Sequence, residues 1–205
     1  VQRLKEMGGT TAVVTPVFYA RHATQEETVR HFEEISKNTN ANLMIYNIPP
    51  FTGQNLTADT IIKISKIDKV IGVKDTSGNF PNFIKLLNYF KGSDFLVHQG
   101  ATNLAVPSML MGADGYIPSL APLFPQAHLK LYGKAGDIEN AMKWGAIVDE
   151  ICKLYPMAKS QTASTKYAMS TLGFVDKRVC QPTEPITEEE MKRIDAHIEK
   201  LRQYM

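Results

Sequence analysis

Cysteine is scarce in this 205-residue chain, which contains only Cys152 and Cys180. Two cysteines without paired spacing exclude a disulfide scaffold and a cysteine-ligated metal site, and they favour a reducing, cytoplasmic environment. The five histidines show no metal-ligand spacing either, so no metal site is expected. Long apolar runs and a signal peptide are also missing, so no membrane-spanning segment is predicted.

Charge of one sign is nowhere concentrated. The 23 basic and 21 acidic residues leave a net charge of +2, and they are spread along the chain without a block of lysine and arginine. Such a block is the electrostatic footprint of a nucleic-acid-binding protein, so nucleic acid is not an expected partner. Hydrophobic residues make up 43% of the chain, which is ordinary for a globular protein.

Short apolar segments alternate with amphipathic ones over the first part of the chain. Five of the apolar segments are predicted to be strands, namely Thr11 to Pro16, Leu43 to Pro50, Val70 to Lys74, Phe95 to Gly100 and Ala113 to Ser119. Amphipathic helices are predicted between them, the first with a capping box formed by Thr24 and Glu27. Strands that alternate with helices at this spacing indicate a parallel sheet built from βα units.

The pattern becomes purely helical near Asp137. Three helices are predicted there, over residues 137–156, 162–173 and 185–201, and the last has a capping box at Thr187 and Glu190. We therefore expect a partial barrel over residues 1–136 and a C-terminal helical extension over residues 137–205.

Five βα units fit two α/β architectures, an open doubly wound sheet and the later part of an eight-stranded TIM (β/α)8 barrel. No G-x-G-x-x-G motif follows the first strand, which weakens the dinucleotide-binding form of the open sheet. Polar residues gather just after the strand ends, where a barrel places its active site, so the barrel is favoured. Because Val1 is not a methionine and VQRLKEMGG resembles the end of a helix that closes on glycine, we expect an N-terminally truncated chain.

The third predicted strand ends in a lysine, Lys74, which is unusual for a segment otherwise apolar. Strand alternation places Lys74 and Gly72 on the inward face, together with Met44 and Tyr46 of the neighbouring strand. Burial lowers the pKa of a lysine, and a neutral amine attacks a ketone to form an imine, with a tyrosine hydroxyl nearby to shuttle protons. The alternative is structural: Lys74 pairs with Asp75, and Tyr46 simply packs.

Two segments resemble a known enzyme family. YNIPPFTG (residues 46–53) and IGVKDTSGN (residues 71–79) are similar to the signature segments of the dihydrodipicolinate synthase / N-acetylneuraminate lyase family, whose members are pyruvate-type class I aldolases and synthases on a TIM barrel. VVTPVFY, HQGATN and GADGYIPS follow in family order, and a three-helix tail comes after them.

The resemblance implies roles for individual residues. Lys74 matches the lysine that forms the Schiff base with a 2-oxo acid, and Tyr46 matches the tyrosine that relays protons. The other matching positions are expected to bind substrate or to shape its pocket, and they are Thr52, Gly53, Gly100 and Ile117. The resemblance also implies a 2-oxo acid and an aldehyde as substrates, no cofactor, and a homo-oligomer, either a tetramer or a dimer.

Two departures from the family pattern bear on the substrate. Phe51 stands where dihydrodipicolinate synthases have an arginine that grips the substrate carboxylate, and a phenyl ring cannot replace that bidentate contact. Phe18, followed by Tyr19, stands where family members lend a tyrosine to a neighbouring active site. We therefore expect an aldolase for a 2-keto-3-deoxy sugar acid.

Other functions stay open. The first alternative is 4-hydroxy-tetrahydrodipicolinate (dihydrodipicolinate) synthase of lysine biosynthesis, and a second is a non-catalytic protein that binds a keto acid. A pyridoxal-phosphate barrel would also use a lysine imine, but no convincing phosphate-binding loop is present. His98, at the end of the fourth strand, either faces the substrate or is a satisfied core histidine.

Overall fold

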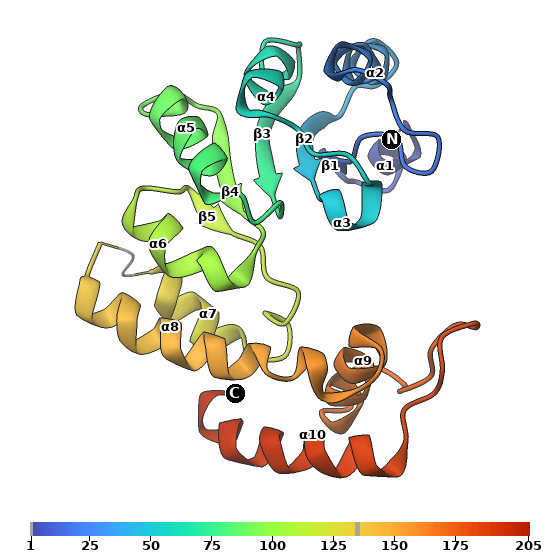
Figure 1. The fold of residues 1–205 in the computed structure, drawn as a ribbon, viewed down its shortest axis with the longest axis vertical. Helices are drawn as coiled ribbons and strands as arrows, with labels where there is room; N and C mark the ends of the chain where they lie inside the picture. The colour runs from blue at the N-terminus through green and yellow to red at the C-terminus, as the bar shows by residue number, and fades with distance from the viewer. Residues whose placement is uncertain (1, 134–135) are drawn as a thin grey trace. The chain divides into compact units, whose positions relative to one another are not determined.

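The computed structural model describes residues 2–133 and 136–205, which form two compact units, Val1–Ile117 and Pro118–Met205 (Figure 1). The division between these units lies earlier in the chain than the boundary predicted between residues 136 and 137, because a helix before that boundary belongs to the second unit. That helix, α7 (Pro125–Tyr132), packs against α8 (Ile138–Cys152). Val1, on which the expected truncation rests in part, lies outside the described residues.

The first unit contains a parallel sheet whose strands follow one another in chain order. Its strands are β1 (Thr11–Val14), β2 (Asn42–Asn47), β3 (Val70–Asp75), β4 (Leu96–Gln99) and β5 (Gly115–Tyr116). Its helices are α1 (Gln2–Glu6), α2 (Gln25–Lys37), α3 (Pro49–Thr52), α4 (Ala58–Ile64), α5 (Phe80–Phe90) and α6 (Ala105–Leu110), with a 3-10 turn, η1 (Thr102–Leu104), before α6. Every neighbouring pair of strands is parallel, as the alternating βα pattern predicts.

The two faces of this sheet differ in burial. Side chains directed toward the helices, such as those of Ile45 and Val73, are completely buried. On the opposite face Val13 is 52% exposed and Leu96 is 36% exposed. Since neighbouring residues of a strand point to opposite faces, this contrast confirms the predicted alternation. Figure 1 shows α2, α4 and α5 following one another along one side of the strands.

The helix ends follow the predicted capping signals. Thr24 and Glu27 form the expected capping box at the start of α2, in which the Glu27 backbone N–H donates to Thr24 Oγ1 over 3.2 Å. Helix α5 lies between the third and fourth strands, where an amphipathic helix is predicted, and the Asn79 side chain accepts from the backbone N–H of Asn82 to cap it. Local side-chain chemistry therefore positions the helices that bracket the strand ends.

The second unit is helical. Its elements are α7, α8, η2 (Tyr155–Met157), α9 (Gln161–Thr171), α10 (Glu188–Leu201) and η3 (Arg202–Tyr204), packed around a core that includes Leu120, Phe124, Ile151 and Ile194. The predicted capping box of the last helix is present at Thr187. Helix α7 was not predicted, because its segment is rich in prolines; the structure accommodates Pro125 in the first turn, where a missing N–H costs nothing.

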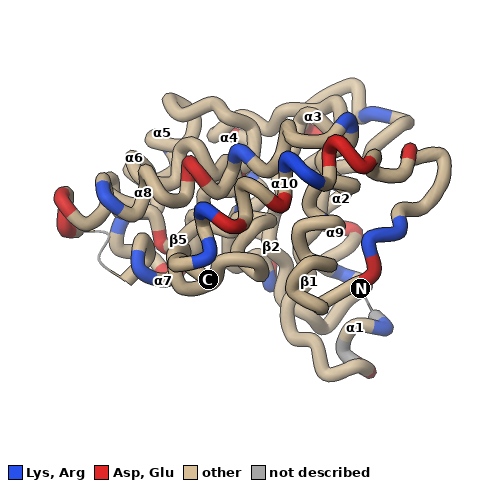
Figure 2. The backbone as a smooth tube through the Cα atoms, turned by 90° about the horizontal axis from the view of Figure 1, so that it is seen from below, with Lys and Arg blue, Asp and Glu red and all other residues tan. Residues whose placement is uncertain are grey.

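Charged residues of both signs are dispersed along the chain tube in Figure 2. In the part of the chain that the structure describes, no helix is both long and apolar enough to cross a bilayer. Within residues 2–133 and 136–205, no group of three or more histidine, cysteine and carboxylate side chains is arranged to hold a metal ion.

Candidate active site

Lys74 and Tyr46 lie side by side at the carboxyl ends of two paired strands. Tyr46 of β2 is the register partner of Lys74 of β3, and Met44 is the partner of Gly72. Lys74 Nζ lies 4.2 Å from the centroid of the Tyr46 ring, within the range of a cation–π contact. Both side chains are partly buried. The structure thus brings together the two residues that the sequence predicts as nucleophile and proton relay.

Gly72 lies where β3 and β4 approach each other closely. A Cβ on Gly72 would lie 2.6 Å from the carbonyl oxygen of Leu96 and 2.9 Å from its Cβ. Glycine is therefore required because the two strands approach closely at this point.

Gly100, which is predicted to line the pocket, lies against Lys74. A Cβ on Gly100 would be 1.9 Å from Thr76 Oγ1 and 3.1 Å from Lys74 Cε. The Gly100 backbone N–H donates to the carbonyl of Asp75 over 2.8 Å, which holds this loop next to the end of β3. Ile117, also predicted to line the pocket, donates its backbone N–H to the Gln99 carbonyl over 2.9 Å and is 37% exposed.

The turn that follows β2 contains the remaining predicted substrate-binding residues. Thr52 is buried, and its hydroxyl donates to the Ile48 carbonyl over 3.1 Å, so it shapes the turn as expected. Gly53 adopts φ +67°, a left-handed conformation that favours glycine. Phe51 is 80% exposed at the surface of the same turn.

His98 of β4 is the register partner of Lys74 on its other side. Its Nδ1 atom is buried and has no hydrogen-bond partner among the described residues. Burial lowers the pKa of His98, against the opposing effect of the Asp114 charge, so the imidazole is neutral at neutral pH. His98 thus brings a ring nitrogen without a partner among the described residues to the strand next to Lys74.

A buried polar row lies on the other face of the same strand ends, and sequence reasoning missed it. Asn47, Asp75 and Gln99 are the last residues of β2, β3 and β4, pair in register, and are at most 2% exposed. Asp75 Oδ1 accepts from Asn47 Nδ2 over 3.2 Å and from the Ser77 N–H over 2.8 Å. The available signal was alternation, since a residue next to an inward Lys74 must face outward.

This row also ties down the loops. Gln99 Nε2 donates to Ser108 Oγ over 2.8 Å, and Asn47 Oδ1 accepts from the Leu56 N–H over 3.0 Å.

Among the ion pairs of the described residues, none joins Lys74 to Asp75, which speaks against the structural alternative for this lysine. Burial raises the pKa of Asp75 above its ordinary value of 3.8, because desolvation disfavours the carboxylate.

The loop after β1 is held against the turn after β2. Gln54 Nε2 donates to the carbonyl of Val17, and Arg21 Nη1 donates to the carbonyl of Gly53 over 3.3 Å. Between these anchors Tyr19 is 98% exposed with φ +67°, an uncommon conformation for a residue other than glycine. Its neighbour Phe18 is 66% exposed.

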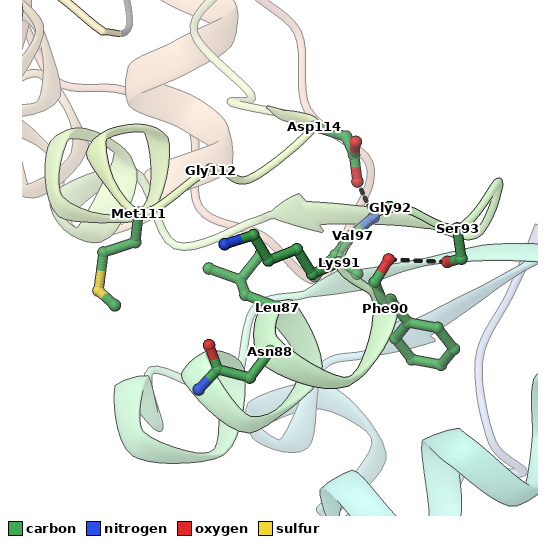
Figure 3. Close-up of a pocket in the computed structure, with 10 residues that line it drawn as sticks. All are labelled: Leu87, Asn88, Phe90, Lys91, Gly92, Ser93, Val97, Met111, Gly112 and Asp114. Atoms are coloured by element: carbon green, nitrogen blue, oxygen red, sulfur yellow. Dashed lines mark hydrogen bonds between the residues drawn. The ribbon is translucent and has the colours of Figure 1, made fainter.

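A separate hollow of about 200 Å³ opens in the first unit, drawn in Figure 3. Its lining includes Leu87 and Lys91 from the α5 region and Met111 and Asp114 from the approach to β5. Asp114 Oδ2 accepts from the backbone N–H of Val97 over 2.7 Å. None of the predicted site residues lines this hollow.

A parallel βα sheet with a lysine and a tyrosine paired at its strand ends is the arrangement expected of the predicted class, the βα-barrel enzymes that use a lysine. The model of the Dihydrodipicolinate synthetase family matches residues 1–201, and the chain belongs to this family. Its members are pyruvate-dependent class I aldolases and lyases, so the expected family, enzyme class and fold class are confirmed.

Individual relatives share this family and fold. The chain is 29% identical to 4-hydroxy-tetrahydrodipicolinate synthase of Chlorobaculum parvum, over 98% of the chain and 68% of the relative. It is 31% identical to the enzyme of that name from Neisseria meningitidis serogroup B, over 93% of this chain and 66% of the relative. A structure of dihydrodipicolinate synthase from Acinetobacter baumannii complexed with pyruvate superposes with a TM-score of 0.88 at 25% identity, covering 98% of this chain and 68% of that one. The chain thus spans about two thirds of these proteins.

We expect Gly100→Ala to disturb the site directly. The added methyl group would overlap Thr76 Oγ1 and press on Lys74 Cε, at 1.9 and 3.1 Å. Overpacking of this kind lowers the free energy of unfolding by about 1–3 kcal/mol, and displacement of Lys74 should slow its reaction with keto acids. Chemical denaturation and a trapping assay with borohydride measure the two effects. Gly136→Ala, where an added Cβ meets nothing within 4 Å, is the matched control, and equal behaviour of the two variants would contradict the packing described here.

Stability should depend on pH through Asp75. Because the folded pKa is raised above 3.8, the folded state holds the proton more tightly than the unfolded state. The resulting stability is fully present below pH 3.8 and is lost as the pH rises through the folded pKa. Asp75→Asn does not ionise and should lack this decline. The free energy of unfolding of the variant minus that of the parent should therefore increase as the pH rises from 3.8 toward neutral.

The control for this experiment is Asp68→Asn, which removes a carboxylate with an 83% exposed side chain. Urea unfolding of the parent and of both variants at several pH values gives the comparison. Parallel pH profiles for the parent and Asp75→Asn would show that Asp75 titrates normally in the folded protein.

Proposed function

We propose that the protein containing this chain is a Schiff-base-forming lyase that makes or breaks a carbon–carbon bond between pyruvate and an aldehyde. The observation that carries this proposal is the position of Lys74 Nζ, 4.2 Å from the ring centroid of Tyr46 at the carboxyl ends of β2 and β3. Membership of the family supports it, and so does the similar Acinetobacter baumannii enzyme that was crystallised with pyruvate.

The chemistry assigns a step to each group. The Lys74 amine, once it has given up its proton, attacks the keto carbon of pyruvate, an N–C bond forms, and the keto oxygen leaves as water after accepting two protons. Loss of a methyl proton gives an enamine, whose carbon attacks the aldehyde carbon while the aldehyde oxygen takes a proton. Hydrolysis of the new imine frees Lys74. The Tyr46 hydroxyl, next to the amine, is the group that gives and accepts these protons.

For the acceptor we propose aspartate semialdehyde, as in a 4-hydroxy-tetrahydrodipicolinate synthase. The two relatives described above both carry that name, and this support outweighs the sugar-acid expectation. The 2-keto-3-deoxy sugar acid remains the second candidate, because the exposed Phe51 offers a neutral wall where the family's arginine would stand. A keto-acid-binding protein without turnover is the non-enzymatic alternative. The cytoplasmic location and the tetramer or dimer stay predictions.

Pyruvate and borohydride should label Lys74. Reduction of the imine leaves a stable adduct on the peptide that contains this lysine, and mass spectrometry of the digested protein detects it. Tyr46→Phe is the matched variant: it keeps the ring beside the amine but removes the proton relay, so labelling should persist while kcat falls by about 10²–10⁴-fold. Labelling that survives Lys74→Ala would remove Lys74 from this role.

The acceptor can be tested by comparing kcat/KM for condensation of pyruvate with aspartate semialdehyde and for cleavage of a 2-keto-3-deoxy sugar acid. We expect the condensation to be faster. Phe51→Arg should favour it further by about tenfold or more, since a hydrogen bond to a charged group contributes about 1.5–3 kcal/mol. Phe51→Leu, which removes the ring without adding charge, is the control. Faster sugar-acid cleavage by the unaltered protein would overturn the proposed acceptor in favour of the second candidate.

A further inference from the structure

The loops at the carboxyl ends of β1 to β4 are almost free of charge. They comprise residues 15–24, 48–57, 76–79 and 100–104, and their only charged side chain other than histidine is that of Arg21. The carboxyl ends of parallel strands meet at one edge of a sheet, and Lys74 and Tyr46 lie at this edge. Arg21 is therefore the one fixed positive charge that these four loops supply, and no carboxylate in them neutralises it.

The Arg21 side chain is held against the turn that contains Phe51. Its Nη1 donates to the Gly53 carbonyl over 3.3 Å, and its Cδ lies 2.9 Å from the position of a Cβ on Gly53. The second link between these loops, from Gln54 to the Val17 carbonyl, fixes the loop that carries Arg21. The guanidinium thus contacts Gly53, which follows Phe51 by two residues in the turn after β2.

The guanidinium has unused hydrogen-bonding capacity. Arg21 is exposed, and the ion pairs among the described residues do not include it. A guanidinium has five N–H donors in a planar fork, and the Gly53 carbonyl takes one of them. The remaining donors suit a carboxylate or a phosphate, which such a fork binds through two parallel hydrogen bonds.

We propose that Arg21 binds the anionic group at the far end of the acceptor aldehyde and so selects charged acceptors over neutral ones. This inference rests on the proposed function, because it assigns Arg21 to the second substrate of the Lys74 imine. The anion is the carboxylate of a short semialdehyde or the phosphate of a phosphorylated aldehyde, since a guanidinium recognises both. Arg21, in the loop after β1, supplies the positive charge that dihydrodipicolinate synthases have at the position of Phe51.

The test uses the complete protein and three aldehydes, each condensed with pyruvate. Aspartate semialdehyde carries a carboxylate, glyceraldehyde 3-phosphate carries a phosphate, and glyceraldehyde carries neither. Arg21→Gln should raise KM for the anionic acceptor by about tenfold or more and leave KM for pyruvate and the reaction of glyceraldehyde unchanged. Arg21→Lys, which keeps the charge but not the fork, should restore part of the loss. Arg30→Gln, the same substitution at an exposed position of α2, is the control.

The outcomes distinguish a failure of the inference about Arg21 from a failure of the proposed function on which it rests. A loss confined to the semialdehyde, or to the phosphorylated aldehyde, supports the inference and identifies the anion. Equal loss with all three aldehydes, or no loss with any, would show that Arg21 only ties the two loops together and would overturn it. If pyruvate and borohydride leave no adduct on Lys74 of the unaltered protein, the proposed function fails, and the inference fails with it. If the adduct forms on Lys74 but Arg21→Gln loses activity equally with charged and neutral acceptors, the inference about Arg21 is wrong and the proposed function stands.

Discussion

A one-residue shift in register between β2 and β3 sets the geometry of the candidate site. Leu43 pairs with Val70, but the next residue, Met44, pairs with Gly72, so Ile71 has no partner of its own. Without that shift Tyr46 would stand opposite Val73 and Lys74 opposite Asn47. Because side chains alternate between the two faces, an extra residue changes which side chains meet across the strands. The contact of amine and phenol depends on this irregularity.

The two faces of the strand ends have different functions: one carries the candidate reactive residues, and the other holds the strand ends to their loops. Toward the helices, the Asn47, Asp75 and Gln99 row is buried and hydrogen-bonded to the loops that follow each strand. Toward the other face, Lys74 has Tyr46 and His98 as its register partners. The hydrogen bonds of this row hold the strand ends to their loops, although Asp75 Oδ2 in the row and Nδ1 of His98 on the reactive face are buried without a hydrogen-bond partner among the described residues.

Local signals predicted much of the architecture. Both predicted capping boxes form, because Thr and Glu side chains act on backbone groups within one turn. The family motifs located Lys74 and Tyr46 on adjacent strands. Helix α7 was missed because proline is compatible both with a loop and with a first helical turn, and only packing against α8 distinguishes the two. The same packing moved the unit boundary to Ile117.

By itself, the sequence determined the order of strands and helices, the family, and which residue types stand at each strand end. The order of elements and the residues at the strand ends follow from periodicity and from side chains that act on near neighbours, whereas the family follows from the resemblance of residues 46–53 and 71–79 to its signature segments. Only the tertiary structure decided that Gly72 serves a close approach of β4 and that Arg21 reaches the turn at Gly53. Arg21 and Gly53 are far apart in the chain, and no local pattern encodes a contact that exists only after parallel strands have paired and brought their loops to one edge.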